Sequence, residues 1–284
     1  MAYMKRSLII LLFWAPATGT AQYYYHDIIT ALETERRQTI YRSEQVRRMT
    51  ATGIDANGSR TTDYAEVHDL FDSGRTLRIS LRNGPAHSVV RYGFNDAGRL
   101  ISCLDSSNGV VSQIEYEHDT AGRILRIRNT LRDSARDFNQ TETHQWSYDG
   151  SGRPSGMWRV INGSDSLEIR FSTDENGNTG EERSYRKSRE TAMVYYYYDD
   201  TDRLTDVVRY NTRYKRLMPD LMFEYDESGR VIQKIATTSG QNQRYVIWRF
   251  IYDEKGLKTR EVLFDQEKRL TGKIEYQYQR GPSR

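Results

Sequence analysis

The groups in this sequence that could act as acids, bases or nucleophiles are its histidines, its acidic side chains and one cysteine. The histidines are scattered along the chain: His26, His68, His87, His118 and His144. His68 and Asp69 could pair, but no serine or cysteine motif accompanies them as a nucleophile. Cys103 lies in a strand-like apolar run, which favours a small buried hydrophobic residue. We therefore expect no catalytic residues and no enzymatic activity.

Metal and cofactor sites are not expected either. The segment Asp174–Asn178 resembles a calcium loop, but it lacks the alternating ligands and the distant glutamate of such a loop. It fits a hairpin turn better. The sequence contains neither a glycine-rich phosphate loop nor a His-Glu-x-x-His motif. We predict no bound metal and no cofactor.

The aromatic residues are the candidates for ligand binding. Four consecutive tyrosines on one strand place aromatic rings on both faces of a sheet, and the run Val246–Tyr252 is apolar on both sides. Exposed rings of this kind stack on sugars or bind a partner protein. The alternative is that they are core residues of a curled sheet. The candidate ligand-binding residues are Tyr195, Tyr196, Tyr197, Tyr198, Trp248 and Phe250.

A repeated turn motif determines which elements position these residues. It occurs as Tyr148–Arg153 (YDGSGR) and Tyr225–Arg230 (YDESGR), with close copies at Phe94–Arg99 and His118–Arg123. The aspartate can accept hydrogen bonds from backbone N–H groups two residues on, and the glycine tolerates a positive φ. His118 stands where other copies have tyrosine, so we interpret it as a tyrosine substitute. Each copy predicts a tight β-hairpin turn.

Alternating strands flank these turns. Ile114–His118 and Ile274–Tyr278 alternate apolar or aromatic residues with polar ones, so that each strand has one buried face. From Asn95 onward, successive turns are 24 to 30 residues apart, an interval that accommodates two strands and a second turn. The sequence therefore predicts an all-β fold, an antiparallel meander of repeated β-hairpins that forms an extended or curled sheet. This hairpin domain spans residues 46–279, and residues 280–284 form a tail.

The N-terminal region departs from the hairpin pattern. Residues 1–21 combine a basic start, an apolar run from Leu8 to Trp14 and small residues at Gly19 and Ala21. This pattern is typical of a secretory signal peptide, and an N-terminal membrane anchor is the alternative. Residues 22–45 follow as a short helical cap. Its helix, Asp27–Arg37 with Asp27 as N-cap, would cover the first open edge of the sheet.

Composition limits the partners. The net charge of +3 includes Lys5 and Arg6, and without them 40 basic residues face 39 acidic ones. A nearly neutral mature chain does not indicate binding of nucleic acid through bulk charge. A single cysteine excludes an internal disulfide, so packing and hydrogen bonds must hold the exported fold together.

The Tyr-Asp-x-x-Gly-Arg turns, each followed by a strand rich in leucine or isoleucine, resemble the YD or RHS repeats of bacterial exported and surface proteins. The resemblance covers most of the chain from about residue 50. In large members of that family the repeats form a long spiralling β-sheet that can enclose a toxic C-terminal domain. This chain is too short for such a shell, so the resemblance implies the strand-and-turn architecture and export.

From these observations we expect a non-catalytic exported binding or scaffold protein of the cell envelope, in the periplasm, at the cell surface or secreted. Its partner would be a glycan or an envelope protein, with no nucleic acid and no transmembrane helix after signal cleavage. Two alternatives remain: an outer-membrane β-barrel, and an enzyme whose site is assembled from distant strands.

Overall fold

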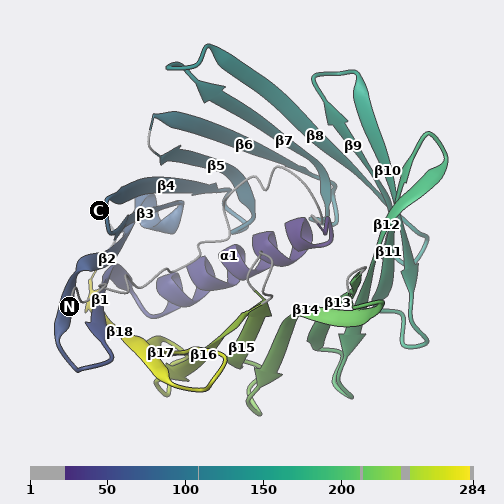
Figure 1. The fold of residues 1–284 in the computed structure, drawn as a ribbon. Coiled ribbons are helices and arrows are strands. Elements are labelled where there is room, and N and C mark those ends of the chain that lie inside the picture. The colour runs from purple at the N-terminus through teal and green to yellow at the C-terminus, as the bar shows by residue number, and fades with distance from the viewer. Residues whose placement is uncertain (1–22, 108, 212–213, 238–243, 282–284) are drawn as a thin grey trace.

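The computed structural model describes residues 23–107, 109–211, 214–237 and 244–281. In this part of the chain one helix is followed by 18 antiparallel strands and one 3-10 turn (Figure 1). The elements are α1 His26–Ser43, β1 Val46–Asp55, β2 Arg60–Phe71, η1 Asp72–Gly74, β3 Thr76–Asn83, β4 Ala86–Phe94, β5 Leu100–Ser107, β6 Val110–His118, β7 Ile124–Asp133, β8 Phe138–Tyr148, β9 Pro154–Ile161, β10 Asp165–Thr173, β11 Thr179–Arg186, β12 Arg189–Tyr198, β13 Leu204–Asn211, β14 Arg216–Tyr225, β15 Val231–Thr237, β16 Tyr245–Tyr252, β17 Lys258–Phe264 and β18 Leu270–Arg280. The predicted signal peptide lies outside the described residues, as do residues 282–284 of the predicted tail.

The sheet closes on itself. Each strand pairs with the next one along the chain, and β18 pairs with β1 through a register that includes Met49 opposite Tyr278 and Ala51 opposite Tyr276. The predicted meander of antiparallel hairpins is confirmed, but the extended or curled sheet is wrong, because the strands form a closed barrel. Closure pairs the backbone groups that an edge strand would leave open.

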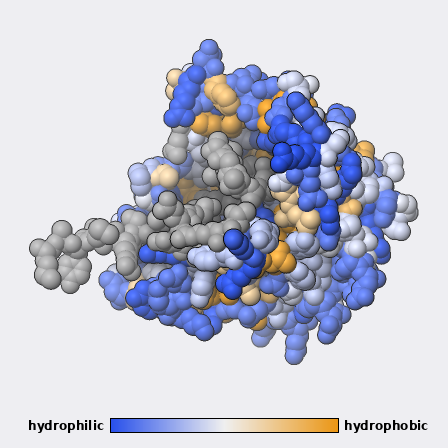
Figure 2. Space-filling view, turned by 45° about the vertical axis from the view of Figure 1, so that its right-hand side comes forward, coloured by the Kyte–Doolittle hydropathy of each residue, from blue (hydrophilic) through white to orange (hydrophobic). Residues whose placement is uncertain are grey.

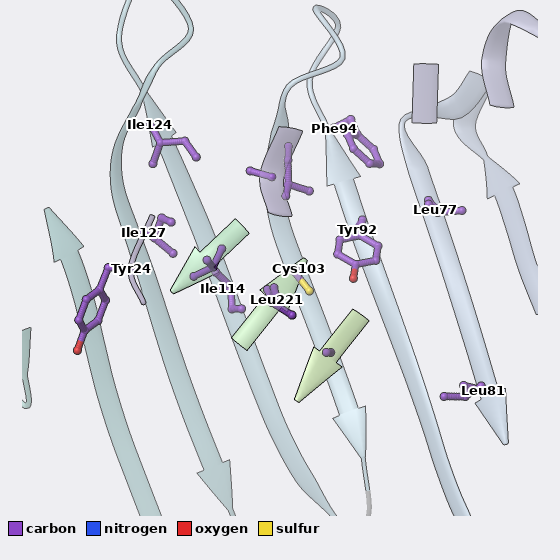
Figure 3. Packing of buried hydrophobic residues seen from close by; sticks show 14 of the residues in the cluster. Tyr24, Leu77, Leu81, Tyr92, Phe94, Cys103, Ile114, Ile124, Ile127 and Leu221 are labelled. Atoms are coloured by element: carbon purple, nitrogen blue, oxygen red, sulfur yellow. The ribbon is translucent and has the colours of Figure 1, made fainter. Parts of the chain in front are cut away.

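The two faces of the barrel wall differ in chemistry. Figure 3 shows buried side chains such as Leu77, Tyr92, Cys103 and Ile114, which project from neighbouring strands into the interior. The alternate residues of the same strands face outward and are mainly charged or polar, and Figure 2 shows a largely hydrophilic surface. The period of two in the sequence therefore separates an aromatic and aliphatic lumen from a polar exterior.

Helix α1 lies inside the barrel, within the ring of strands (Figure 1). Its buried residues are Ala31, Thr34, Gln38 and Tyr41, and its nearest elements are β1, η1 and β5. The helix was predicted correctly as an element, but its predicted role as an edge cap is wrong, because a closed sheet has no edge to cover. Its N-cap residue is Tyr25 rather than Asp27.

The Tyr-Asp-x-x-Gly-Arg turns, which we call YD turns, connect neighbouring hairpins along one rim. In the turn after β8, the Asp149 carboxylate accepts hydrogen bonds from the N–H groups of Ser151 and Arg153, and Gly152 has a φ of 80°. The Tyr148 hydroxyl donates to the carbonyl oxygen of Ile124 at 2.8 Å, and the guanidinium of Arg123 covers the Tyr148 ring.

Gly152 also lies close to the neighbouring turn. A Cβ atom at this position would lie 2.9 Å from a guanidinium nitrogen of Arg123, the arginine of the preceding turn. The contact is not common to all copies of the motif, because a Cβ atom at Gly229 would meet nothing within 4 Å. The candidate calcium loop is another such turn, in which the Asp174 carboxylate accepts the N–H groups of Asn176 and Asn178.

Candidate binding site in the barrel lumen

The structure distributes the predicted ligand-binding aromatic residues over both faces of the wall. Tyr196 and Trp248 are buried in the lumen, whereas Tyr197 faces outward and is 47% exposed. Tyr195 shares the outward face of β12 with Tyr197, because side chains alternate along a strand. Tyr196 and Trp248 therefore occupy core positions, as the alternative interpretation holds. Ligand binding by the outward tyrosines stays a prediction.

The two remaining candidates are half-buried and already have intramolecular partners. The Tyr198 hydroxyl donates to the carbonyl oxygen of Thr179 at 2.9 Å, as expected for a YD turn. The Phe250 ring lies 4.5 Å from the Lys258 ammonium, measured to the ring centroid. The six residues thus do not form one platform, because the barrel wall separates them into inner and outer groups.

The lumen does hold one ligand-like segment, the N-terminal part of the described chain. Glu182, on β11 and only 1% exposed, accepts hydrogen bonds from the backbone N–H groups of Tyr24 at 2.9 Å and Tyr25 at 3.0 Å. The Tyr196 hydroxyl donates to the same carboxylate at 2.7 Å. Burial raises the pKa of Glu182, although these hydrogen bonds act in the opposite direction. The Glu182 carboxylate thereby satisfies backbone N–H groups next to the start of α1, a helix that has no side-chain cap of its own.

A second group of contacts, the His144 cluster, consists of Asp27, Glu142, His144 and Arg159. One ring nitrogen of His144 lies 2.5 Å from the Asp27 carboxylate of the helix, and the other lies 2.8 Å from Glu142 on the same strand. Arg159 on β9 makes two further hydrogen bonds to Glu142, at 2.9 and 3.0 Å. The wall thus presents a cationic ring to an acidic residue in the first turn of α1.

Electrostatics in the His144 cluster favour the charged forms. Burial alone would lower the pKa of His144, but the carboxylates of Asp27 and Glu142 raise it to about 9. Burial would raise the pKa of Glu142, yet the hydrogen bonds from His144 and Arg159 lower it to about 2. At neutral pH the cluster therefore holds an imidazolium between two carboxylates.

The His68 cluster, Tyr41, Tyr64, Glu66 and His68, contacts the other end of the helix. The Tyr41 hydroxyl of α1 lies 3.0 Å from Nδ1 of His68, and Nε2 lies 2.5 Å from the Glu66 carboxylate. Tyr64 also donates to Glu66. A neutral ring satisfies this arrangement, since Nε2–H donates to Glu66 while Nδ1 accepts from Tyr41. Consistent with this assignment, burial lowers the pKa of His68.

Between the two clusters, polar contacts continue along the helix. The Glu35 carboxylate accepts hydrogen bonds from the guanidinium of Arg99 and the backbone N–H of Leu100, each at 2.9 Å. The side-chain amide of Gln38 donates to the carbonyl oxygen of Gly74 at 2.7 Å. These contacts fix both the position and the rotation of α1 against the wall.

The other potentially reactive side chains in the lumen are either in an unreactive protonation state or already hydrogen-bonded to neighbouring residues. Burial raises the pKa of the Cys103 thiol to about 12, so it is not a thiolate at neutral pH. Both ring nitrogens of His68 and of His144 contact residues that position α1. Within the described ranges, no group of three or more histidine, cysteine or acidic side chains is arranged to hold a metal ion. The arrangement is chemically suited to binding a helix.

Glu66, His68, Glu142, His144 and Glu182 were missed as site residues, although a signal for four of them exists. Both histidines follow a glutamate by two residues, so each pair shares one face of its strand. In each case that face also carries buried aromatic or aliphatic residues, Tyr64 and Leu70 on β2 and Trp146 on β8. A charged pair on the buried face of a strand requires polar partners from another element, and α1 supplies them.

Comparison with known proteins gives one similar sequence. A scan of protein-family models finds no match. The chain is 30% identical over 198 residues to "Double-stranded DNA deaminase toxin A" of Burkholderia cenocepacia (strain H111), covering 66% of this chain and 12% of that protein. This chain thus spans about an eighth of the curated relative. The relative is named as an enzyme, which contradicts the prediction of a protein without enzymatic activity.

Two solved structures resemble this barrel. A porin-like protein from Bacteroides uniformis ATCC 8492 is 12% identical with a TM-score of 0.37, covering 82% of this chain and 98% of that one. A TcdB2-TccC3-TEV structure is 14% identical with a TM-score of 0.31, and the match covers 78% of this chain and 15% of that one. At these TM-scores neither likeness supports an argument. Within the described residues, no helix is both long and apolar enough to cross a membrane.

Proposed function

We propose that this protein is an exported barrel of YD-type hairpins that encloses a polypeptide segment in its lumen, and that α1 is the segment enclosed here. The observation that carries the proposal is the set of buried polar contacts between α1 and the wall. Carboxylates and histidines on β2, β8 and β11 bind Tyr41, Asp27 and the N–H groups before the helix. Burying such groups costs free energy unless each is partnered, and the enclosed segment supplies the partners.

The proposal includes a wall that faces water in the cell envelope or outside the cell. Outward-facing ion pairs such as Arg170 with Glu168 and Arg183 with Glu181 support it. An arginine or lysine on the lipid face of a barrel costs about 2–4 kcal/mol at the bilayer midplane. The second candidate is an outer-membrane barrel filled by α1, which the closed 18-stranded form favours over an open binding sheet.

The similar sequence fits the enclosing role. Because β1–β18 span residues 46–280, a match over 198 residues must include a large part of the barrel. We propose that the shared segment consists of YD or RHS repeats. Tyr195 and Tyr197 stay candidates for binding a glycan or an envelope protein on the outer face.

The experiment combines cell fractionation with proteolysis of the full chain. We expect the protein in the fraction that is released without detergent, and we expect trypsin to leave the Arg36–Arg37 site in α1 uncut while it cleaves exposed arginines such as Arg136. Recovery only in detergent would favour the outer-membrane barrel. Cleavage at Arg36 as fast as at Arg136 would contradict enclosure of the helix.

A further inference from the structure

The tyrosines of the YD turns make one recurring contact. Each hydroxyl donates to the backbone carbonyl at the start of the strand that follows the preceding turn. The pairs are Tyr148 with Ile124, Tyr198 with Thr179, Tyr225 with Leu204 and Tyr252 with Val231. The contact ties each hairpin to the previous one around the rim.

The turn after β10 departs from this rule. Its tyrosine position holds Thr173, which is exposed and too short to reach across the hairpin. The tyrosines of the turns on either side, Tyr148 after β8 and Tyr198 after β12, are both present. The rim therefore lacks one aromatic ring, and the gap lies between β8 and β12.

The N-terminal segment places Tyr25 among the rings of this region. The Tyr25 ring centroid lies 5.3 Å from that of Tyr196 and 6.2 Å from that of Phe171. A side-chain hydrogen bond with Tyr25 helps, after burial, to raise the pKa of Tyr198. Phe171 is in turn stacked on Trp146 at 5.3 Å. Tyr25 thus contacts inward-facing aromatic residues of β10 and β12, the strands next to the missing tyrosine.

We propose that Phe171, Tyr196, Tyr198 and Glu182 form a specific binding site, the tyrosine socket, which selects the enclosed segment. The socket binds an aromatic residue that immediately precedes a helix, here Tyr25, while Glu182 binds the backbone N–H groups beside it. Loss of tyrosine at position 173 creates the space. This inference rests on the proposed enclosing function and adds the chemical feature by which a segment is recognised.

The test measures hydrogen exchange of α1 amides in the full chain. Tyr25→Ala removes the ring and is expected to speed exchange in the N-terminal half of α1 by at least tenfold, because amides exchange faster where the structure opens locally. Thr173→Tyr fills the socket from the wall and is expected to speed exchange of the same amides, while amides of β8 and β12 keep their rates. Tyr197→Ala, on the outer face of β12, is the matched control and should leave the exchange rates of the α1 amides unchanged.

A third measurement compares two peptides on one and the same protein variant. A fluorescent peptide of residues 23–44 is added to the full-length Tyr25→Ala protein, and we expect saturable binding that weakens at least tenfold when the peptide itself carries Tyr25→Ala. Unchanged exchange of α1 in both variants, or equal binding of the two peptides, would overturn the socket. Fast exchange of α1 in the unmodified protein would instead contradict the enclosing function itself.

Discussion

His68 and His144 occupy equivalent positions on two strands of the barrel. Each follows a glutamate by two residues, is buried in the lumen and contacts one end of α1. The helix residue that each one meets is different. His144 meets the Asp27 carboxylate and needs both N–H donors, whereas His68 meets the Tyr41 hydroxyl and accepts from it. The same strand motif therefore produces a charged ring at one end of the helix and a neutral ring at the other.

The difference shows that the enclosed segment contributes to the electrostatics of the wall. The pKa of His144 is raised to about 9 by Asp27 and Glu142 against the effect of burial, while burial keeps the pKa of His68 low. The strands alone offer each histidine one glutamate. The second partner comes from α1, and it decides the protonation state.

The largest expected effect follows from His144→Ala. This substitution removes the cation between the half-buried carboxylates of Asp27 and Glu142, and only Glu142 keeps another cationic partner, Arg159. Breaking a buried ion pair in this way costs about 3–5 kcal/mol. Urea unfolding should show a loss of this size, with His87→Ala on the exposed part of β4 as the control. A loss below about 1 kcal/mol would mean that the His144 cluster does not hold the helix.

The pH dependence of stability should show the next largest effect. The folded-state pKa of His144, about 9, exceeds the unfolded value of 6.5, so its contribution is full below pH 6.5 and is lost as pH rises to 9. A shift of this size corresponds to about 3 kcal/mol. Unfolding free energies at pH 6.5 and pH 9.5 measure it, and Asp27→Asn should reduce the difference. An equal alkaline loss in Asp27→Asn would contradict the assignment.

The His68 cluster should respond in the opposite direction. Burial lowers the folded-state pKa of His68, so its contribution is full above the unfolded value of 6.5 and is lost as pH falls below it. His68→Ala should cost about 1–3 kcal/mol at neutral pH, because it leaves Tyr41 and Glu66 each short of a partner. It should also lessen the sensitivity to mild acid. Both effects are measurable by urea unfolding. A loss of stability as large as that of His144→Ala would contradict the difference between a charged and a neutral histidine.

The smallest effect is expected for Tyr41→Phe. This change keeps the ring in place and removes the hydroxyl that donates to His68, at a cost of about 0.5–1.5 kcal/mol. Thermal unfolding monitored by circular dichroism measures it. The outward Tyr197→Phe, which keeps its ring on the exposed face, is the matched control and should be neutral. A neutral Tyr41→Phe would indicate that the helix end is held by packing alone.

The sequence predicted local structure better than assembly. Asp149 and Gly152 specify their turn through short-range hydrogen bonds and a positive φ, so the hairpins could be recognised from the motif alone. Closure depends on how 18 successive strands curve until β18 meets β1, which no single turn encodes. The location of α1 was missed because it depends on partners far apart in the chain, such as Asp27 and His144.

The candidate site illustrates the same limit. Tyr196 was singled out for its place in a run of tyrosines, and its hydroxyl does belong to the site, as a donor to Glu182 rather than as a surface ring. Whether Tyr196 is inside or outside depends on the register of β12, and the apolar residues on both of its faces left that register ambiguous. Glu182 carried no signal of its own, since it lies in the charged run Glu181–Arg183 and such runs are common in this chain.

The enclosure of α1 between two histidines is tested most directly by an NMR titration of the imidazole rings in the full-length protein, with His68 and His144 assigned by substitution. We expect His144 to stay protonated up to about pH 9, while the lowered pKa of His68 keeps that ring neutral at pH 6.5. Two rings that titrate together near the ordinary histidine value of about 6.5 would contradict it. That result would mean that the wall does not hold α1 between a charged and a neutral histidine.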